Sequence, residues 1–531
     1  MYRHVILLIA IWLLAASMHA GDSLPIIEVR ADRTMIYPQR MELTGEESLL
    51  DVLQMMPDLM IRGYEDVLNG YNLRIDNSPV NGDVRLVLSQ MKAKDIAKIQ
   101  VCGNTGVAKG TVGTGRVLDI NMAVRDTVQG FVEGQGGFGK TMEGNGTVNL
   151  LVGSSHTDIY ANATYRYQQG HKEYLTLHMT NRFDDKNRLL TYFTQQYIDQ
   201  PDAASQKILG RARYFHTFNS EGTELLVVGG YQYDNNLLLS NKLPIYIVEL
   251  NTPLGLKQLT MMAGVEGDFL MTHETGTDRS WDVFNNDIYL QFAYSLPHWQ
   301  FTAGNRVMFY NYRLQEPTAT QTHFDVRNNT AASVIYTPTL QHQIQVAYYR
   351  KFSNPAYTDL FMDPNTIIGT QWAMLMSAGL LDENVINQFL LSYAYSRQKL
   401  TVQTEASYYL QEGGSHFAIL AASAYWRTRW LTLTGGANLQ VAKSQTFASI
   451  RVAPTAYLPR NWQIGLQVVY YTKGSPMRDL YGTPVYACLS VNKQIKNRWN
   501  IGVDWHDMFD SLCSEAKVNR HAATIKLQFR Y

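Results

Sequence analysis

The sequence predicts an all-β transmembrane barrel of about 22 antiparallel strands, preceded by a small α/β domain. From about residue 128 to the C-terminus, apolar and polar residues alternate with the period of a strand that has two different faces. The alternating stretches are roughly 10 to 15 residues long, which suits a tilted crossing of a bilayer. Their apolar faces are rich in Tyr, Trp and Phe near the ends, as membrane interfaces require.

The first 20 residues are typical of a secretory signal peptide. MYRHVILLIAIWLLAASMHA has a basic start at Arg3, an apolar run over 5–16, and small or polar residues that lead to Ala20. A membrane anchor is the alternative, but an anchor needs about 20 apolar residues and this run is shorter. We therefore expect residues 1–20 to be cleaved after export.

Residues 21–125 predict a small α/β domain. Its apolar patterns indicate three short strands and two helices, the strands at 26–31, 71–76 and 96–101 and the helices at 44–59 and 84–91. The longer helix has Thr44 and Glu47 at capping-box spacing and Pro57 near its end. A barrel of about 22 strands has a lumen wide enough to leak, so we expect this domain to plug it.

Within residues 126–531, apolar and polar residues alternate in many successive stretches. In TDIYANATYRYQ, Tyr165 and Tyr167 lie on the predicted apolar face and Asn162 lies on the polar face. The same alternation recurs at 400–410, 431–442, 462–470 and 523–531. A soluble sandwich alternates in the same way, but the length of the stretches and their aromatic ends favour a barrel. The polar face carries charged residues that we expect to form structural pairs inside the barrel: Arg166, Glu405, Lys526 and Arg530.

The connections between the predicted strands also alternate. Tight turns are expected at every second position, including 154–156, 184–187, 219–222 and 458–461. Longer loops are expected between them, above all at residues 353–383. Outer-membrane barrels have short periplasmic turns and longer outer loops, and an even number of strands leaves both chain ends on the periplasmic side.

The stretch GQGGFGKT, residues 134–141, matches the nucleotide-binding P-loop letter for letter. A P-loop needs a buried strand before the glycines and a helix after them. Here Gly144 and Gly146 follow closely, and each would destabilise such a helix by about 1 kcal/mol. We instead predict a β-hairpin with Lys140 and Thr141 near its tip, whose glycines pack closely against a neighbouring strand or the plug.

Composition narrows the class of protein further. The chain has 46 basic and 46 acidic residues, so it lacks the basic excess that nucleic-acid binding requires. Its three cysteines, Cys102, Cys488 and Cys513, are too scattered for a disulfide framework or a zinc site. The 13 histidines show no metal-ligand spacing, so neither a metal site nor another cofactor is predicted.

Several stretches of the sequence resemble motifs of the TonB-dependent outer-membrane receptors. ESLLDVLQMMPDLMI resembles the first helix of the plug in that family, and YNLRIDNSPVNG resembles its strand and turn, with Asp76 and Asn77 in place of Asp-Gly. The stretch 91–122 matches the glycine-rich plug signature through Asp95, Ile96, Ile99, Val101, Gly103, Gly115 and Ile120. VAYYRKFSNPAYTDLF and GLLDEN resemble mid-barrel motifs, and the final Tyr531 fits the barrel-assembly signal.

This resemblance implies a plug domain at 21–125 and an outer-membrane barrel at 126–531 in a Gram-negative cell. It implies uptake of a scarce, small extracellular ligand, driven by a TonB-like periplasmic protein. Only GDSLP precedes IIEVRA, so one stretch would serve both as the partner-binding TonB box and as the first plug strand: Pro25, Ile26, Ile27, Glu28 and Val29. That segment would pair with the partner by β-strand addition.

The long stretch 353–383 offers the best candidates for contact with the extracellular ligand. These are Tyr357, Asp359, Asp363 and Trp372. The alternative for this stretch is a loop that packs its own aromatic residues together. The identity of the ligand is left open between iron chelates, vitamins, glycans and peptides.

Two other classes of protein fit the pattern less well. One is a barrel that does not transport actively, such as an adhesin, a structural protein or a constricted porin. The other is a membrane-embedded enzyme, which would need a Ser/His/Asp or paired-carboxylate set on facing strands. Only a few histidines near turns neighbour such candidates: His298, His416, His506 and His521. We therefore predict a protein that is not an enzyme.

Overall fold

The computed structural model describes residues 27–530 with gaps. In the N-terminal domain it covers the strands, the short helices and a few adjoining residues, and in the barrel it covers every strand and many of the turns. The longest stretches outside the described residues are 1–26, 55–70, 353–384 and 507–521. The predicted signal peptide and capping box therefore lie outside the described part of the chain.

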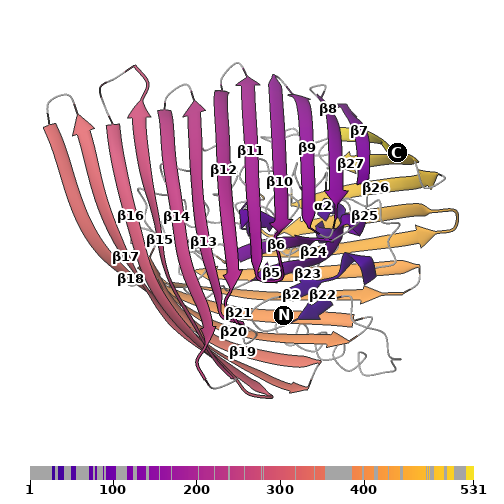
Figure 1. Cartoon of the computed structure of the whole chain (residues 1–531). Helices are drawn as coiled ribbons and strands as arrows, with labels where there is room; N and C mark the ends of the chain where they lie inside the picture. The colour runs from indigo at the N-terminus through magenta and orange to yellow at the C-terminus, as the bar shows by residue number, and fades with distance from the viewer. Residues whose placement is uncertain are drawn as a thin grey trace.

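Twenty-two antiparallel strands, β7 to β28, form a closed barrel (Figure 1). Their bounds are β7 Val128–Phe138, β8 Glu143–Gly153, β9 Thr157–Gln168, β10 His171–Arg182, β11 Asn187–Gln200, β12 Ala203–Thr217, β13 Glu224–Asn236, β14 Leu239–Pro253, β15 Leu259–Glu274, β16 Ser280–Ser295, β17 Trp299–Glu316, β18 Ala319–Thr339, β19 His342–Phe352, β20 Val385–Arg397, β21 Leu400–Gln411, β22 His416–Arg427, β23 Leu431–Ala442, β24 Thr446–Leu458, β25 Trp462–Tyr471, β26 Val485–Ile495, β27 Trp499–His506 and β28 Ala522–Arg530. The last strand closes the ring on the first, from Ala523 opposite Phe138 to Arg530 opposite Phe131. The predicted number of strands is thus confirmed.

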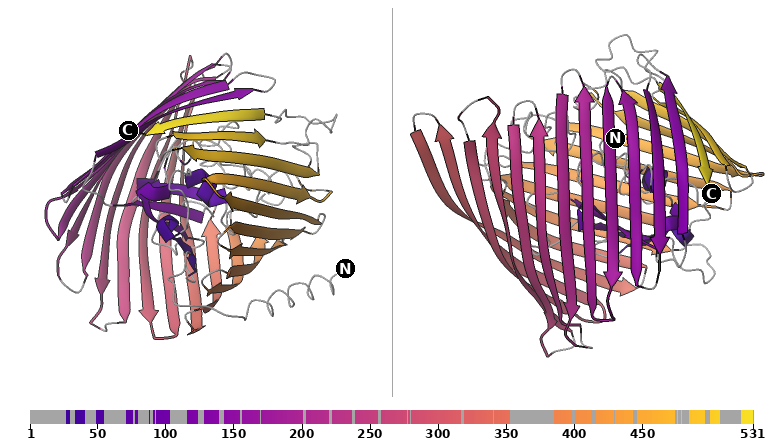
Figure 2. Two further views of the ribbon diagram at one scale, coloured as in Figure 1. Left: turned by 90° about the vertical axis from the view of Figure 1, so that its right-hand side faces the viewer. Right: turned by 45° about the horizontal axis from the view of Figure 1, so that its top comes forward.

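The N-terminal domain is a six-stranded sheet of order β1-β2-β5-β6-β3-β4. Its elements are β1 Ile27–Val29, β2 Thr34–Ile36, 3-10 helix η1 Pro38–Arg40, α2 Leu49–Gln54, β3 Tyr71–Ile75, β4 Ser78–Pro79, 3-10 helix η2 Ala93–Asp95, β5 Ile96–Cys102 and β6 Arg116–Met122. The end-on view of Figure 2 shows these elements inside the ring of barrel strands. No described helix combines the length and the apolar character needed to span a bilayer.

The two faces of the barrel strands differ as the alternation predicts. In β9, the side chains of Tyr165 and Tyr167 are 44% and 48% exposed on the outer face. Asn162 and Thr164, which precede them in the strand, are each 4% exposed and face the lumen. Aliphatic and aromatic side chains therefore cover the outside of the barrel, which is the surface that a lipid environment stabilises.

The barrel wall is much taller on one side than on the other. Strands β14 to β18 contain 15 to 21 residues, whereas β25 to β28 contain 8 to 11. Figure 1 shows the long strands on the left and the short ones on the right. The predicted strand length of 10 to 15 residues is therefore too narrow at both limits.

The predicted tight turns all lie at one end of the barrel, between β8 and β9, β10 and β11, β12 and β13, and β24 and β25. At the opposite end the expectation of longer loops is wrong for most connections. Four of them contain two residues each: 169–170, 201–202, 237–238 and 317–318. Only 353–384, 472–484 and 507–521 exceed five residues there. On the tall wall, height comes from lengthened hairpins, because each added residue raises a strand by about 3.3 Å.

The P-loop-like stretch belongs to a β-hairpin, as expected. Residues 134–138 lie in β7, and Gly134 is opposite Gly146 of β8. The expectation that these glycines pack closely is wrong, because a Cβ placed on Gly134 or Gly146 would meet no atom within 4 Å. Both positions face outward, so their small size leaves open space on the outer surface of the barrel.

Candidate functional site

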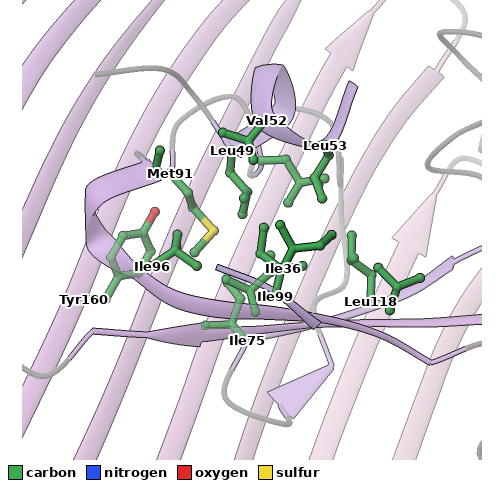
Figure 3. Packing of buried hydrophobic residues seen from close by; sticks show 14 of the residues in the cluster. Ile36, Leu49, Val52, Leu53, Ile75, Met91, Ile96, Ile99, Leu118 and Tyr160 are labelled. Atoms are coloured by element: carbon green, nitrogen blue, oxygen red, sulfur yellow. The ribbon is translucent and has the colours of Figure 1, made fainter. Parts of the chain in front are cut away.

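The plug domain and the barrel wall share one apolar core. The core contains buried plug side chains from β2, α2, β3, β5 and β6, including Ile36, Leu49, Leu53, Ile75 and Ile99. Four inward-facing side chains of the barrel join the same cluster: Tyr160 of β9, Tyr192 of β11, Leu209 of β12 and Tyr425 of β22. Figure 3 shows Tyr160 next to Met91 and Ile96 of the plug. Burial of this surface holds the plug against the wall.

A charged contact lies beside this apolar one. Arg213 of β12 is 5% exposed and interacts electrostatically with Arg74 and Asp119 of the plug and with Glu249 of β14. Arg74 and Asp119 are partners in the parallel pair of β3 and β6, so one point of the plug sheet presents both charges. Arg74 and Arg211 act on Arg213 as like charges, and Asp119 and Glu249 act on it as the opposite charges that a buried cation needs.

The charged contact continues along the lumen wall. The Tyr289 hydroxyl of β16 donates a hydrogen bond to Glu249 Oε2 at 2.6 Å. The Arg306 guanidinium of β17 lies 5.2 Å from the centre of the Tyr289 ring. Arg306 Nε donates to Asp287 Oδ2 at 2.7 Å, and its Nη2 donates to Glu266 Oε2 at 2.6 Å. Hydrogen bonds and ring contacts therefore link β14, β15, β16 and β17, and the electrostatic interactions of Arg213 relate this network to the plug.

The backbone of β15 makes room for this network. A Cβ on Gly264 would collide with the Tyr289 hydroxyl and would lie 2.9 Å from the carbonyl oxygen of Val248. Gly264 is opposite Tyr289 in the register of β15 and β16. Glycine is required here because the Tyr289 side chain lies across the backbone to reach Glu249.

The predicted partner-binding segment is partly described. Ile27, Glu28 and Val29 form β1, the edge strand of the plug sheet, and pair with Ile36, Met35 and Thr34 of β2. β1 also lies against barrel strand β20. Pro25 and Ile26 lie outside the described residues.

The predicted ligand-contact residues lie within 353–384, outside the described part of the chain: Tyr357, Asp359, Asp363 and Trp372. The strands that flank this stretch are β19 and β20. The other two long connections, 472–484 and 507–521, follow β25 and β27. All three therefore arise at the same end of the barrel, the first of them directly after the tallest hairpin, β17 and β18, and the other two among the shortest strands.

Two of the charged residues predicted to form pairs inside the barrel have described side chains; both lie on the lumen face, and the pairs themselves stay a prediction. Arg166 is half-buried on the lumen face of β9. Glu405 accepts a hydrogen bond from Ser407 Oγ at 3.0 Å, and Ser407 is 2% exposed. Lys526 lies opposite Gln135 of β7, and the side chains of Lys526 and Arg530 lie outside the described set. The described residues contain no group of three or more His, Cys, Asp or Glu side chains arranged to hold a metal ion.

Sequence reasoning missed Arg213, Glu249, Tyr289 and Arg306. Alternation does place each of them on the inward face of its strand. It gives no sign that they meet, because they come from four different strands spread over more than ninety residues. A charged residue on the polar face of a membrane strand is the signal that could have marked them as a group.

No protein-family model matches the sequence, and no curated protein is significantly similar to it. Solved structures are similar to the whole chain in fold. The siderophore receptor PirA from Pseudomonas aeruginosa matches with a TM-score of 0.66 and 12% identity, over 95% of this chain and 100% of that one. The ferric-catecholate import receptor Fiu from E. coli K12, in its open form, matches with a TM-score of 0.67 and 11% identity, over 96% and 100% of the two chains. The siderophore receptor PirA from Acinetobacter baumannii matches with a TM-score of 0.66 and 8% identity, over 94% and 98%. With a sheet-based plug seated inside a closed barrel of 22 strands, this chain has the fold of the TonB-dependent outer-membrane receptors.

Proposed function

We propose that this protein is an outer-membrane receptor that takes up a scarce extracellular ligand through a plugged barrel. Residues 1–20 direct export to a Gram-negative cell envelope and are removed. Residues 21–125 form the plug and 126–531 form the barrel in the outer-membrane lipid. A TonB-like periplasmic protein supplies the work for uptake, so the chain needs neither a nucleotide nor a catalytic site.

The seating of the plug is the observation that carries this proposal. The plug and the wall share an apolar core through Tyr160, Tyr192, Leu209 and Tyr425, and they share buried charges around Arg213. A plug held by both kinds of contact does not leave the lumen by itself, because its buried charges and apolar surface would have to be exposed together. Passage of a ligand therefore requires work from outside the barrel.

The periplasmic partner pulls on β1. β1 is an edge strand joined to the plug by three residue pairs with β2, so little of the plug has to separate before β1 is free. An extended segment that begins near Pro25 can add to a strand of a periplasmic partner. A pull along Pro25 to Val29 would then be transmitted to β2 and β5, the next strands of the sheet.

Deletion of residues 22–29 tests this coupling. The variant should still bind ligand at the cell surface, since the deleted residues are at the plug edge, but uptake should fall to the level of a strain without the receptor. Binding and accumulation of labelled ligand are measured on the same cells. Collapse of the proton gradient in cells with the intact receptor should reproduce the loss. Undiminished uptake in the deletion variant would contradict the proposal and favour a passive barrel. The observation on the side of a passive barrel is that Ile27–Val29 are already used as a strand of the plug.

For the ligand we propose a small chelate of the kind bound by siderophore receptors, because those receptors share the fold. The candidates for contact are Tyr357, Asp359, Asp363 and Trp372, on the longest connection at the outer end of the barrel. Tyr357→Ala and Trp372→Ala should each weaken ligand binding, since each removes an aromatic ring against which a chelate can pack. Growth under iron limitation, compared with limitation of carbon, tests the ligand class.

A further inference from the structure

The tryptophans of the barrel are concentrated at its short-turn end, on one half of the wall. Trp430 ends the turn between β22 and β23, Trp462 begins β25, and Trp499 begins β27. Their exposed fractions are 63%, 42% and 41%. Trp299 begins β17 in the same way. Indole rings favour the level of the lipid headgroups, so these residues mark the membrane interface at this end.

A basic residue accompanies each of these tryptophans in the sequence. The stretches are PHW at 297–299, RTRW at 427–430, PRNW at 459–462 and KNRW at 496–499. The tight turns between β8 and β13 have no tryptophan and carry Phe183 and Phe218 instead. One of those turns has the acidic pair Asp184 and Asp185. The pairing of cation and indole therefore belongs to one half of the rim.

The turn between β24 and β25 shows how such a pair is built. Arg460 and Asn461 both have positive φ, at 65° and 60°, which gives a tight hairpin that projects Arg460 beyond the strands. Lys493 of β26 is opposite Trp462 in register, and its Nζ lies 5.0 Å from the centre of the indole ring. The same Nζ donates a hydrogen bond to the carbonyl oxygen of Arg460. The Lys493 ammonium group and the Trp462 indole ring are thus held together on the outer surface of the barrel, beside the backbone of Arg460.

Apolar side chains lie beside this group on the outer face. Leu458 of β24 is opposite Trp462, and Ile495 of β26 is opposite Trp499. Both are exposed on the outer face, at 44% and 39%. Within the described part of the chain, no carboxylate forms an ion pair with Arg460 or Lys493. The surface therefore offers apolar contact, an indole ring and positive charge without a protein counter-ion side by side at this end of the barrel.

We propose that the rim formed by Arg460, Trp462 and Lys493, extended by Trp430 and Trp499, binds the headgroup of an anionic phospholipid in the periplasmic leaflet. The phosphate accepts hydrogen bonds from the guanidinium and the ammonium group, and the acyl chains lie along the outward-facing side chains farther from the turns, such as Leu466 and Ile501. This site rests on the proposed placement of the barrel in the outer membrane with its short turns toward the periplasm. It gives the barrel a fixed lipid neighbour on its shortest wall.

Lipid retention by the purified, detergent-solubilised protein tests the site. The protein is equilibrated with phosphatidylglycerol or phosphatidylethanolamine, and bound lipid is counted by native mass spectrometry. We expect phosphatidylglycerol to be retained in preference, and Arg460→Gln with Lys493→Gln to weaken its retention by about 30-fold, because each basic residue near an anionic headgroup contributes about a factor of five.

A control variant removes the same charge elsewhere. Lys186→Gln with Lys242→Gln removes two exposed cations, one in the turn between β10 and β11 and one near the other end of β14. This control should retain phosphatidylglycerol like the unmodified protein, and the gel mobility of unheated samples should show that both variants are folded. Equal retention by all three proteins, equal loss in both variants, or equal retention of phosphatidylglycerol and phosphatidylethanolamine by the unmodified protein would each overturn the site. The variant without residues 22–29 should retain phosphatidylglycerol like the unmodified protein whether or not it takes up ligand. Each of the two proposals can therefore fail without the other.

Discussion

Arg306 shows how one residue of the lumen wall depends on its neighbours. Its side chain is 5% exposed and lies between the carboxylates of Glu266 and Asp287, which are 18% and 7% exposed. Removal of one member of a buried ion pair leaves the others uncompensated, which destabilises a protein by about 3–5 kcal/mol. The geometry of this trio therefore has direct consequences for stability.

We expect Arg306→Met to lower the free energy of unfolding by about 3–5 kcal/mol, because two carboxylates then repel each other in a dry site. The triple variant Arg306→Met, Asp287→Asn, Glu266→Gln should recover most of that loss, since no buried charge remains. Thermal unfolding followed by circular dichroism in detergent measures both. A single variant as stable as the unmodified barrel would show that water reaches this part of the lumen.

Gly264 permits a second test at the scale of one residue. We expect Gly264→Ala to displace the Tyr289 side chain, break its 2.6 Å hydrogen bond to Glu249, and destabilise the barrel by about 1–3 kcal/mol. Gly210→Ala is the control, because a Cβ there would meet no atom within 4 Å. If thermal unfolding gives the same midpoint for both variants, the close approach of Tyr289 to the β15 backbone is not needed.

At the scale of the elements, the side chain of Asp184 stabilises the turn of the β10–β11 hairpin. The Oδ1 atom of Asp184 accepts hydrogen bonds from the backbone N–H groups of Lys186 and Asn187 at 2.8 and 2.7 Å. The Asn187 side-chain amide also donates to both carboxylate oxygens. These bonds, first the Asn187 side chain and then the Lys186 backbone, hold the pKa of Asp184 below its ordinary value.

This lowered pKa gives the turn a pH dependence of definite sign. The stabilisation is fully present above the pKa of an unfolded aspartate, about 3.9, and is lost as pH falls through the lower folded value. We expect Asp184→Ala to reduce protection of the turn amides from hydrogen exchange at neutral pH. The unmodified protein should show the same reduction only in acid. Turn protection that does not change with Asp184→Ala would mean that the strands alone hold the hairpin.

The strands themselves were largely predictable, and the connections less so. Alternation assigned Tyr165 and Tyr167 to the outside and Asn162 to the lumen, and the structure confirms this. The tight turns were also predicted, because turn residues interrupt the alternation at 154–156 and 458–461. The two-residue connections opposite them were not predicted, since a lengthened hairpin such as β17 and β18 continues the alternation through the turn.

At the scale of the whole molecule, the barrel closes without the plug. β28 pairs with β7 over eight residue pairs, and every other strand pairs with its neighbours in sequence. Among the described residues, the plug meets the wall through the shared core, through the charges around Arg213, and where β1 lies against β20. We therefore expect a chain without residues 21–125 to form an open pore.

Planar-bilayer recordings test this expectation. The variant without 21–125, still carrying its signal peptide, should conduct ions steadily, whereas the full chain should remain closed under the same voltage. Its unheated gel mobility and circular dichroism should match those of a folded barrel. A folded variant that does not conduct would show that the wall and its outer connections, and not the plug, close the lumen.

The sequence by itself determined the class of fold, the number of strands and the face of each strand, because a period of two and a membrane-length strand are local properties that side chains record directly. Only the tertiary structure decided which wall is tall, where the plug is seated, and that Arg213, Glu249, Tyr289 and Arg306 form one network. Those features depend on strand stagger and on contacts between residues far apart in the chain. Alternation records which way a residue points, and carries no information about what it meets.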